Sequence, residues 1–575
     1  MPLLLNIYTY CYNLYVALEE MCMINKISVE NNSLNSNYSP LNSKKQDNSN
    51  PNFRGGGLWI ATVGLMQACE RNPMINVAVI DMLSAILPRT FVESLTNWFA
   101  GFEAFRRESS GLIVNCLIPS FITMGVAAAI NRLIMPKNSN LAKCWADSKL
   151  IENISETYTN SSSTDKVSDT FKQLIKSVEG VDREKTVKLS NALTNEEIES
   201  YATKLKELSQ RDIKAFNIKE QRAFKNEIDN LAKEIAEKTH IYENLTISGG
   251  RTSASTLSSL FQDSIKYIHE YGNAQKHDST ISMADFAKRG KKLVRTKSAL
   301  GLAIVLPLAA SMQYINRWIT SKVSGVKGAP IYNDFGKDTD NDKNQHHKSQ
   351  EGLLKQKIIS ISSMIAVGLL SMMKVPSWNM FEFKGQFPTM DQARIISTTT
   401  FASRMAAAED KNELRESTIR DICTFLSLYF LGDYAAKGTA TIIEKKMGIS
   451  LLNDTKPIKK DANGLQKFWH WFKDVKLKSS EEVLSKTAES LKSKGLTPTE
   501  EQKNIIEKEL KKAKNMRSAC QLSNLGVSLA LLGLIIPIFL RKSTAKKHAE
   551  EIKQSQNVAS SDDSKATAKL EAVAA

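Results

Sequence analysis

Ionisable residues lie inside and beside apolar segments near the start of the chain. Asp81 lies within the apolar run 74–87, and Arg89 follows that run. A second group precedes the uncharged segment 111–130, and its members are Glu103, Arg106, Arg107 and Glu108. Because ionisable groups at membrane depth often line an ion path or a binding site, these six residues are candidates for one.

The competing interpretation of Asp81 is structural. An aspartate among apolar residues can pair with a nearby arginine and simply orient a helical hairpin, and such ion pairs are common at these positions. We favour this structural interpretation over an ion path.

Three aspartates have the spacing that opens a calcium-binding loop. Asp338, Asp340 and Asp342 form the pattern DxDxD. Such a loop needs glycine at its sixth position for a sharp turn and a bidentate glutamate at its twelfth. Those positions hold Lys343 and Ser349. The sequence therefore predicts a solvated polar loop, and the aspartates are only a weak candidate for a metal site.

Motifs for catalysis and nucleotide binding are missing from the sequence. The seven histidines form no HExxH, and neither GxSxG nor a Walker A motif occurs. The segment 249–253 precedes a helical pattern, so its amides could meet an anion, but a turn and a helix cap explain it equally. We therefore expect no enzymatic activity and no cofactor.

The charge balance favours a membrane surface over nucleic acid as the partner. The 575 residues carry a net charge of +16, and seven cysteines include no CxxC pair. Two basic groups flank apolar segments: Lys288, Arg289, Lys291, Lys292, Arg295 and Lys297 precede one, and Arg541, Lys542, Lys546 and Lys547 follow another. Since neither zinc-finger spacing nor a basic stripe interleaved with aromatics occurs, we expect no nucleic acid and instead expect a lipid bilayer.

The segment 519–540 is the strongest candidate for a membrane-spanning helix. Its 22 residues reach about 33 Å as a helix, and the hydrocarbon layer is about 30 Å thick. Twelve are Leu, Ile, Val or Phe, which favours insertion by about 5 kcal/mol. The alternative is the central helix of a soluble bundle, but soluble cores rarely need a helix that is apolar on every side. Gly526, Ala530 and Gly533 share a face that another helix, or a second copy, could approach closely.

Three further segments, 111–130, 298–315 and 358–373, are also predicted to span a membrane. The run 74–87 is not, because its seven Leu, Ile and Val residues gain about 3 kcal/mol and Asp81 near its middle costs about as much. We expect this run to pack with residues 58–69 as a buried or re-entrant hairpin.

Residues 137–290 are predicted to form a soluble helical domain. They contain no proline, and apolar side chains recur at helical spacing, as at Ile198, Tyr201, Leu205 and Leu208. The pairs Thr194 with Glu197 and Asn217 with Glu220 are typical helix starts. Each helix has a narrow apolar stripe, which predicts coiled-coil-like packing and a surface for a protein partner.

The other segments complete the predicted organisation. A disordered leader (1–54) comes first, and residues 1–22 are not part of it if Met23 is the start. The remaining segments are a first apolar region (55–136), a second membrane region (291–376), a mixed helical peripheral region (377–516), a last span (517–542) and a disordered tail (543–575). The fold class is therefore all-α, as a polytopic helical membrane protein with a soluble helical domain. The basic group before residue 298 predicts that this domain faces the cytoplasm.

Function is predicted only by class. The first hypothesis is a non-enzymatic membrane scaffold or partner-binding protein. The alternative is a transporter or channel with a site near Asp81. It draws on two proline-containing apolar segments, at Pro119 and Pro307, each followed by a similar pentamer (INRLI and INRWI). A soluble helical bundle, or an enzyme whose site no motif reveals, is the third class.

Overall fold

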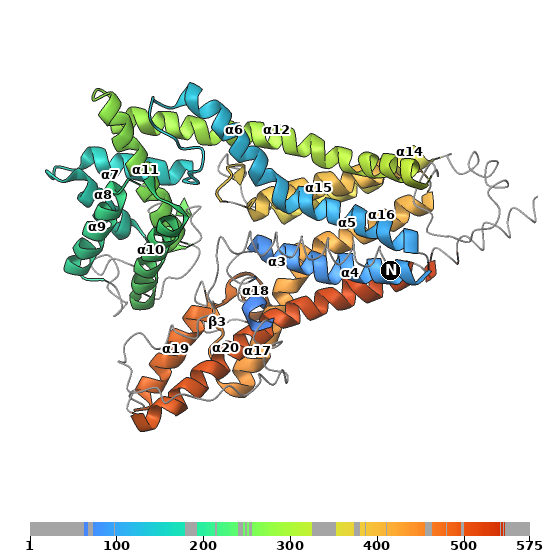
Figure 1. Cartoon of the computed structure of the whole chain (residues 1–575). Coiled ribbons are helices and arrows are strands. Elements are labelled where there is room, and N and C mark those ends of the chain that lie inside the picture. The colour runs from blue at the N-terminus through green and yellow to red at the C-terminus, as the bar shows by residue number, and fades with distance from the viewer. Residues whose placement is uncertain are drawn as a thin grey trace, which may run out of the picture. The chain divides into compact units, whose positions relative to one another are not determined.

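A computed structural model describes residues 62–66, 69, 73–96, 98–178, 193–212, 215–239, 245–247, 250–251, 256–324, 352–372, 380–385, 387–409, 411–454, 463–478, 480–495, 500–540, 542–543 and 546. The chain divides into two compact units, Met1–Gln67 and Ala68–Ala575, and every element named below belongs to the second. The described residues of that unit are all-α apart from two small antiparallel sheets of two strands each (Figure 1).

Three groups of elements make up the second unit. The apolar bundle contains α3 (Pro73–Ile80), η1 (Asp81–Ile86), α4 (Leu87–Thr96), α5 (Trp98–Leu112), η2 (Ile113–Leu117), α6 (Ile118–Ile134), α12 (Met283–Ser324), α14 (Leu353–Ser371), α15 (Met390–Ala407), α16 (Lys411–Leu426), η5 (Ser427–Leu431), α17 (Gly432–Met447), α20 (Glu500–Ser528) and η6 (Leu529–Ile535), where η denotes a π-helical segment. The helical domain contains α7 (Ser148–Asn160), α8 (Lys166–Ser177), α9 (Asn195–Gln210), α10 (Ile218–Thr239), β1 (Thr246–Ile247), β2 (Gly250–Arg251) and α11 (Leu257–His277). A smaller peripheral group contains β3 (Leu452–Asp454), α18 (Gly464–Lys473), β4 (Val475–Leu477) and α19 (Ser480–Ser493).

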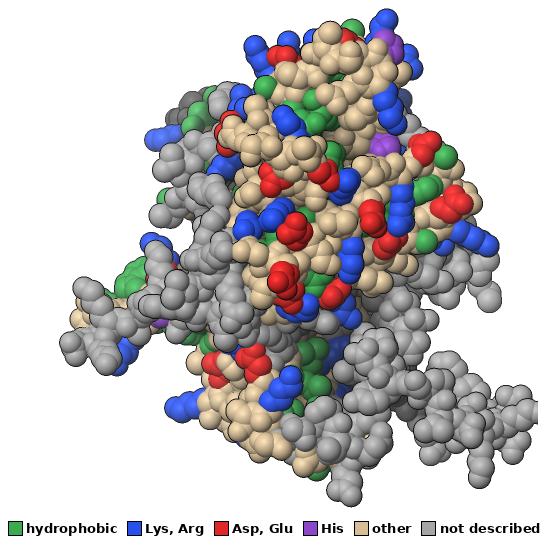
Figure 2. Space-filling model, turned by 90° about the vertical axis from the view of Figure 1, so that its left-hand side faces the viewer, with side chains coloured by type: hydrophobic (Ala, Val, Ile, Leu, Met, Phe, Trp, Pro, Cys, Tyr) green, Lys and Arg blue, Asp and Glu red, His purple; other side chains and the backbone are tan. Residues whose placement is uncertain are grey.

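The helical domain has its own core, formed by α7–α11 and the first part of α12. The predicted helix starts are confirmed, because Thr194 caps α9 in a reciprocal box with Glu197 and Asn217 and Glu220 exchange the same two hydrogen bonds before α10. The predicted stripe is also confirmed, since Ile198 and Leu205 are fully buried. The outward face carries interspersed acidic and basic side chains with only small hydrophobic areas (Figure 2).

Helix α12 joins the domain to the bundle without a break. Its first residues, including Phe286 and Leu293, belong to the domain core, and Val305 and Ala309 belong to a core within the bundle. Pro307 lies inside this 42-residue helix. Polar contacts brace the junction: Lys297 donates to the carbonyl of Cys144 at 2.8 Å. A continuous helix of this kind thus connects the two regions.

Contacts between distant segments set the direction of the bundle helices. Near the start of α16, Glu413 pairs with Arg317, close to the C-terminal end of α12. Arg415 of the same helix donates to Ser543, beyond the end of η6, at 2.9 Å. At the other end, Thr439 of α17 bonds Ser523 of α20 at 2.9 Å. Helices α12 and α20 therefore run parallel, and α16–η5–α17 runs antiparallel to both.

The described residues make seven passes along the bundle: α3–η1–α4, α5–η2–α6, α12, α14, α15, α16–η5–α17 and α20–η6. Because α12 and α20 are parallel, the helical domain before α12 and the peripheral group before α20 lie at the same end of the bundle (Figure 1).

Among the described residues, five helices are long and apolar enough to cross a membrane, and they are Pro73–Leu95, Gly101–Ile134, Met283–Lys322, Leu353–Ser371 and Asn504–Leu540. Three of them contain the predicted segments 111–130, 298–315 and 519–540, and Leu353–Ser371 overlaps all but the last two residues of 358–373. The fifth helix contains the run 74–87 and continues through Pro88, so by length and composition this run is also a candidate span. Its predicted packing with residues 58–69 lies mostly outside the described residues and stays a prediction. The π-helical segment η1 ends two residues before Pro88, and its changed hydrogen-bond register tolerates the absence of a backbone N–H at the proline.

Helices α15 and α16 differ from the peripheral region expected for 377–516. Each packs against other bundle helices, and each buries polar side chains such as Ser397, Arg404, Arg420 and Asp421. Their buried faces contact other helices, so these faces carry polar side chains. For that reason their hydropathy is too low to identify them as bundle helices.

Candidate functional site

Three of the π-helical segments meet at a small polar cavity inside the bundle. Asp81 comes from η1, Asn115 and Cys116 from η2, and Tyr429 from η5. The cavity offers about 20 Å³ to the centre of a water molecule, which is room for one or two waters. π-helical segments within α-helices are frequent at functional sites. The cavity is therefore the candidate site, and its size excludes any substrate larger than a few atoms.

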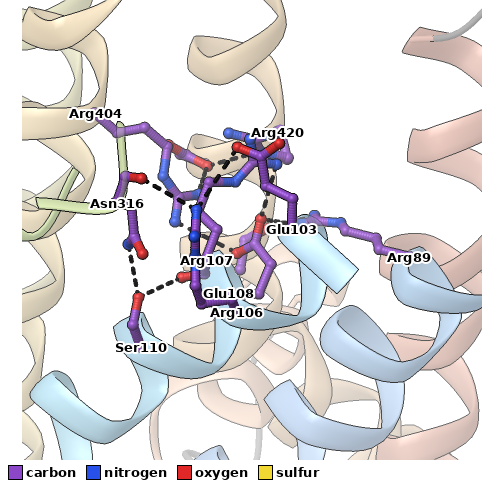
Figure 3. Close-up of polar contacts among 11 residues, drawn as sticks. Arg89, Glu103, Arg106, Arg107, Glu108, Ser110, Asn316, Arg404 and Arg420 are labelled. Carbon is purple, nitrogen blue, oxygen red and sulfur yellow. Dashed lines mark hydrogen bonds and ion pairs between the residues drawn. The ribbon is translucent and has the colours of Figure 1, made fainter. Parts of the chain in front are cut away.

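Glu108 lies at the centre of the charges beside the cavity (Figure 3). Its Oε1 is 3.2 Å from Nη1 of Arg89 and 3.6 Å from Nη2 of Arg107. Its Oε2 accepts a hydrogen bond from Nη2 of Arg404 at 3.4 Å. All four side chains are at most about a tenth exposed. One carboxylate thus connects α4 and α5 to α15.

A second carboxylate extends the cluster to α16. Oδ1 of Asp421 accepts from Nη1 of Arg404 at 2.8 Å and from Nε of Arg420 at 3.1 Å. Arg89 also donates to Oγ1 of Thr424 at 3.4 Å. Four arginines and two carboxylates are therefore buried together and hold α4, α5, α15 and α16 side by side.

Asp81 lines the same cavity but takes no part in this pairing. Within the described part of the chain, no side chain forms an ion pair with its carboxyl group or donates a hydrogen bond to it. The expected pair between Asp81 and a nearby arginine is therefore not formed, and Arg89 instead contacts Glu108. Asp81 is thus a titratable group facing a water-sized space.

Glu103 and Arg106 form a neighbouring network with α12. Oγ1 of Thr320 donates to Glu103 at 2.6 Å, and Arg106 donates to the carbonyl of Asn316 at 3.1 Å. The amide of Asn316 in turn donates to Ser110 at 2.8 Å (Figure 3). A second, smaller cavity lies between this network and the first site and shares Arg404 and Thr400 with it. The polar interior is thus continuous across two adjoining cavities.

The structure brings five of the six sequence candidates into these two networks, and the sixth, Asp81, lines the first cavity beside them. Sequence reasoning missed the partners from α15 and α16, which are Ser397, Thr400, Arg404, Arg420, Asp421 and Thr424. The sequence does contain a signal for some of them. Ser397, Thr400 and Arg404 recur at helical spacing and so form a polar stripe along one face of the helix. Such a stripe is usually interpreted as a solvent face, and here it points into the bundle.

Other chemistry is limited among the described residues. They contain no group of three or more His, Cys, Asp or Glu that could hold a metal ion, and Asp338, Asp340 and Asp342 lie outside them. The cysteines that the structure describes are free, and burial raises the pKa of the Cys144 thiol to about 11, which leaves it protonated. Of the segment 249–253, only Gly250 and Arg251 are described, and they form β2.

The chain matches no family model, and neither the curated proteins nor the solved structures contain one similar to it.

Proposed function

We propose that the chain is an integral membrane protein with a non-enzymatic scaffold role. Its helical bundle lies in a lipid bilayer and holds the domain of α7–α11 at the membrane surface, where that domain binds a protein partner.

The distribution of polar and apolar side chains carries this proposal. Large apolar side chains point outward from the bundle, for example Phe91 and Leu95 of α4, Leu133 of α6 and Leu370 of α14, each more than 60 % exposed. The charged side chains of Glu108, Arg404 and Asp421 are buried inside the same bundle. A soluble protein has the opposite arrangement, and large apolar side chains exposed around a polar interior are typical of contact with lipid.

Two further observations support a scaffold role. The ionic cluster is almost completely paired internally and encloses only water-sized space, as expected of a clamp that fixes helix positions. Helix α12 is one continuous helix from the domain core into the bundle. Both features favour a rigid anchor over a moving gate.

The proposal is tested by fractionation of the full-length protein expressed in cells. Membranes are washed with alkaline carbonate and then extracted with detergent. We expect the chain to remain in the pellet through carbonate and to be released by detergent. Recovery in the carbonate wash or in the soluble fraction would overturn the membrane assignment.

A second candidate function, passage of protons or small ions, is favoured by one observation. Asp81 faces the cavity without an ion-pair partner among the described residues, and a second cavity adjoins the first. The purified chain is reconstituted in vesicles that contain a pH-sensitive dye, and a pH step is applied. The scaffold proposal predicts a leak no faster than that of empty vesicles. A faster leak that Asp81→Asn removes would support ion passage instead.

A further inference from the structure

Helix α18 presents a row of large apolar side chains, each more than a third exposed among the described residues. Leu465, Phe468, Trp469 and Phe472 follow the spacing i, i+3, i+4, i+7, so they share one face. Leu465 is 67 % exposed, and Phe468 and Trp469 are more than half exposed. None of the residues of this helix is buried. An exposed aromatic face of this kind marks a binding surface.

The helix is nevertheless held firmly in place. Asn463 and Gln466 form a capping box at its start. At its end, Nζ of Lys437 donates to the carbonyls of Trp471 and Phe472 at 2.5 and 3.1 Å. The ring of Phe472 stacks on that of Tyr434 with centroids 4.3 Å apart. The aromatic face is therefore presented by a fixed helix.

The contacts of α17 and the following strand locate α18 along the bundle axis. Helix α17, which holds α18, bonds α20 at Ser523, close to the start of the apolar run 519–540. Five residues beyond α18, the carbonyl of Lys478 accepts from Arg517 at 2.5 Å, and Arg517 lies two residues before that run. Helix α18 thus lies level with the end of a proposed membrane span. This is the depth at which Trp and Phe gather in membrane proteins.

The charge around α18 selects the kind of lipid. Residues 437–478 contain ten lysines and four acidic residues. Lys473 flanks the aromatic face, and Lys445 and Lys446 are exposed at the end of α17. An amphipathic aromatic helix surrounded by lysines binds membranes that contain anionic phospholipids.

We propose that α18 is an interfacial helix that inserts its Leu465, Phe468, Trp469 and Phe472 face into the headgroup region of the bilayer and that the surrounding lysines bind anionic phospholipids. This inference rests on the proposed membrane insertion of the bundle and adds a lipid-binding surface to it.

The test uses spin-label depth measurements on the full chain in vesicles. Single cysteines replace Trp469, Ile365 in the middle of α14, or Ile218 on the exposed end of α10, in a background with Cys11, Cys22 and Cys423 changed to serine. Relaxation by oxygen and by a water-soluble nickel complex then reports depth. We expect Ile365→Cys in the hydrocarbon, Trp469→Cys at headgroup depth and Ile218→Cys in water.

The outcomes separate the two proposals. If the label at 365 is in hydrocarbon while that at 469 behaves like that at 218, the interfacial helix is wrong and membrane insertion stands. If all three are in water, both proposals fail.

The lipid class is tested by comparing phosphatidylcholine vesicles with vesicles containing phosphatidylglycerol. The label at 469 should lie deeper in the latter, and K445Q/K446Q/K473Q should abolish that difference. If the label at 469 lies equally deep in both kinds of vesicle when all lysines are present, the anionic-lipid assignment is wrong.

Discussion

Glu108 is the residue on which the buried charges of the bundle converge. Three arginine side chains lie within 3.6 Å of its carboxylate, and they come from α4, α5 and α15. Removing one partner from a buried ionic cluster costs more than the cluster contributes, because the remaining charges stay in an environment of low dielectric. Glu108 is therefore important for holding the helices together, whatever the cavity beside it does.

We expect Glu108→Gln to destabilise the folded chain by about 3–5 kcal/mol, since Arg89 and Arg404 lose their shared counter-charge. The measurement is the yield of monodisperse protein after detergent extraction and its thermal midpoint. Asp81→Asn is the matched control, because it lies on the same cavity without an ion pair among the described residues. Equal losses in the two variants would contradict the role assigned to Glu108.

Asp263 of α11 provides a pH-dependent prediction outside the bundle. Burial raises the pKa of its carboxyl from 3.8 to about 6, although the amide of Trp145 donates to it at 3.0 Å. Between these two values the folded chain binds more protons than the unfolded chain, so this group adds stability as pH falls from about 6 to about 4. Above pH 6 the ionised carboxylate opposes folding.

We therefore expect Asp263→Asn to raise the thermal midpoint more at pH 7.5 than at pH 5, because asparagine keeps an acceptor for Trp145 and carries no charge. Differential scanning fluorimetry of the detergent-solubilised protein at both pH values measures this difference. A midpoint shift that is the same at both pH values would show that the carboxyl titrates normally.

At the scale of single elements, prolines and π-helical segments occur together. Segments η1, η2 and η6 each end two residues before a proline, which is Pro88, Pro119 or Pro537, and each interrupted helix continues beyond that proline. A π-turn changes the hydrogen-bond register and so tolerates the missing proline donor. The same register change directs Asp81 and Asn115 toward the cavity.

The close approach of α17 and α20 gives a prediction with an internal control. A Cβ at Gly432 would lie 2.0 Å from Oδ1 of the buried Asn524, whereas one at Gly438 on the same helix would meet nothing within 4 Å. Alanine favours a helix by about 1 kcal/mol over glycine. We expect Gly438→Ala to be stabilising by up to that amount and Gly432→Ala to be destabilising by about 1–3 kcal/mol through overpacking.

Thermal midpoints of the two glycine variants in the same detergent provide the measurement. The opposite signs matter more than the sizes, because helix propensity alone would stabilise both variants. If Gly432→Ala were as stable as Gly438→Ala, the two helices would not be in the close contact that Asn524 and Gly432 make. Gly533 is also in close contact within the chain, since its Cβ position is 3.1 Å from Pro88, and only Gly526 of the proposed oligomer face is exposed.

The sequence predicts a helix and its packing correctly where the buried side chains are apolar and the exposed ones are polar. Helices α9 and α10 could be predicted with their caps, because each buries one apolar stripe and exposes the rest. Helices α15 and α16 could not be placed in the bundle, because they bury serine, threonine and arginine against other helices. The candidates Arg89 and Glu108 were visible as charges beside apolar runs. Arg404, which pairs with Glu108, was not, because it lies almost 300 residues further along the chain.

At the scale of the whole second unit, the direction of the helices places both water-facing regions at one end of the bundle. Helices α12 and α20 are parallel, so the helical domain and the group of α18 and α19 precede them on the same side. This end carries both the basic group at 288–297 and the lysine-rich segment 437–478. Since basic residues beside membrane spans remain in the cytoplasm, we propose that this end is cytoplasmic.

This arrangement predicts the labelling pattern of three cysteine variants in sealed membrane vesicles. Ile218→Cys in the domain and Lys492→Cys in α19 should react with an impermeant maleimide from the same side, and Lys546→Cys, beyond the end of α20, should react only from the opposite side. The pattern follows because five passes separate the domain from residue 546, and an odd number of passes changes side. Labelling of 218 and 546 from one side would require an even number. Helix α15 or the α16–α17 helix would then not cross the membrane, and the buried charges of Arg404 and Asp421 would need a different environment from the bundle interior.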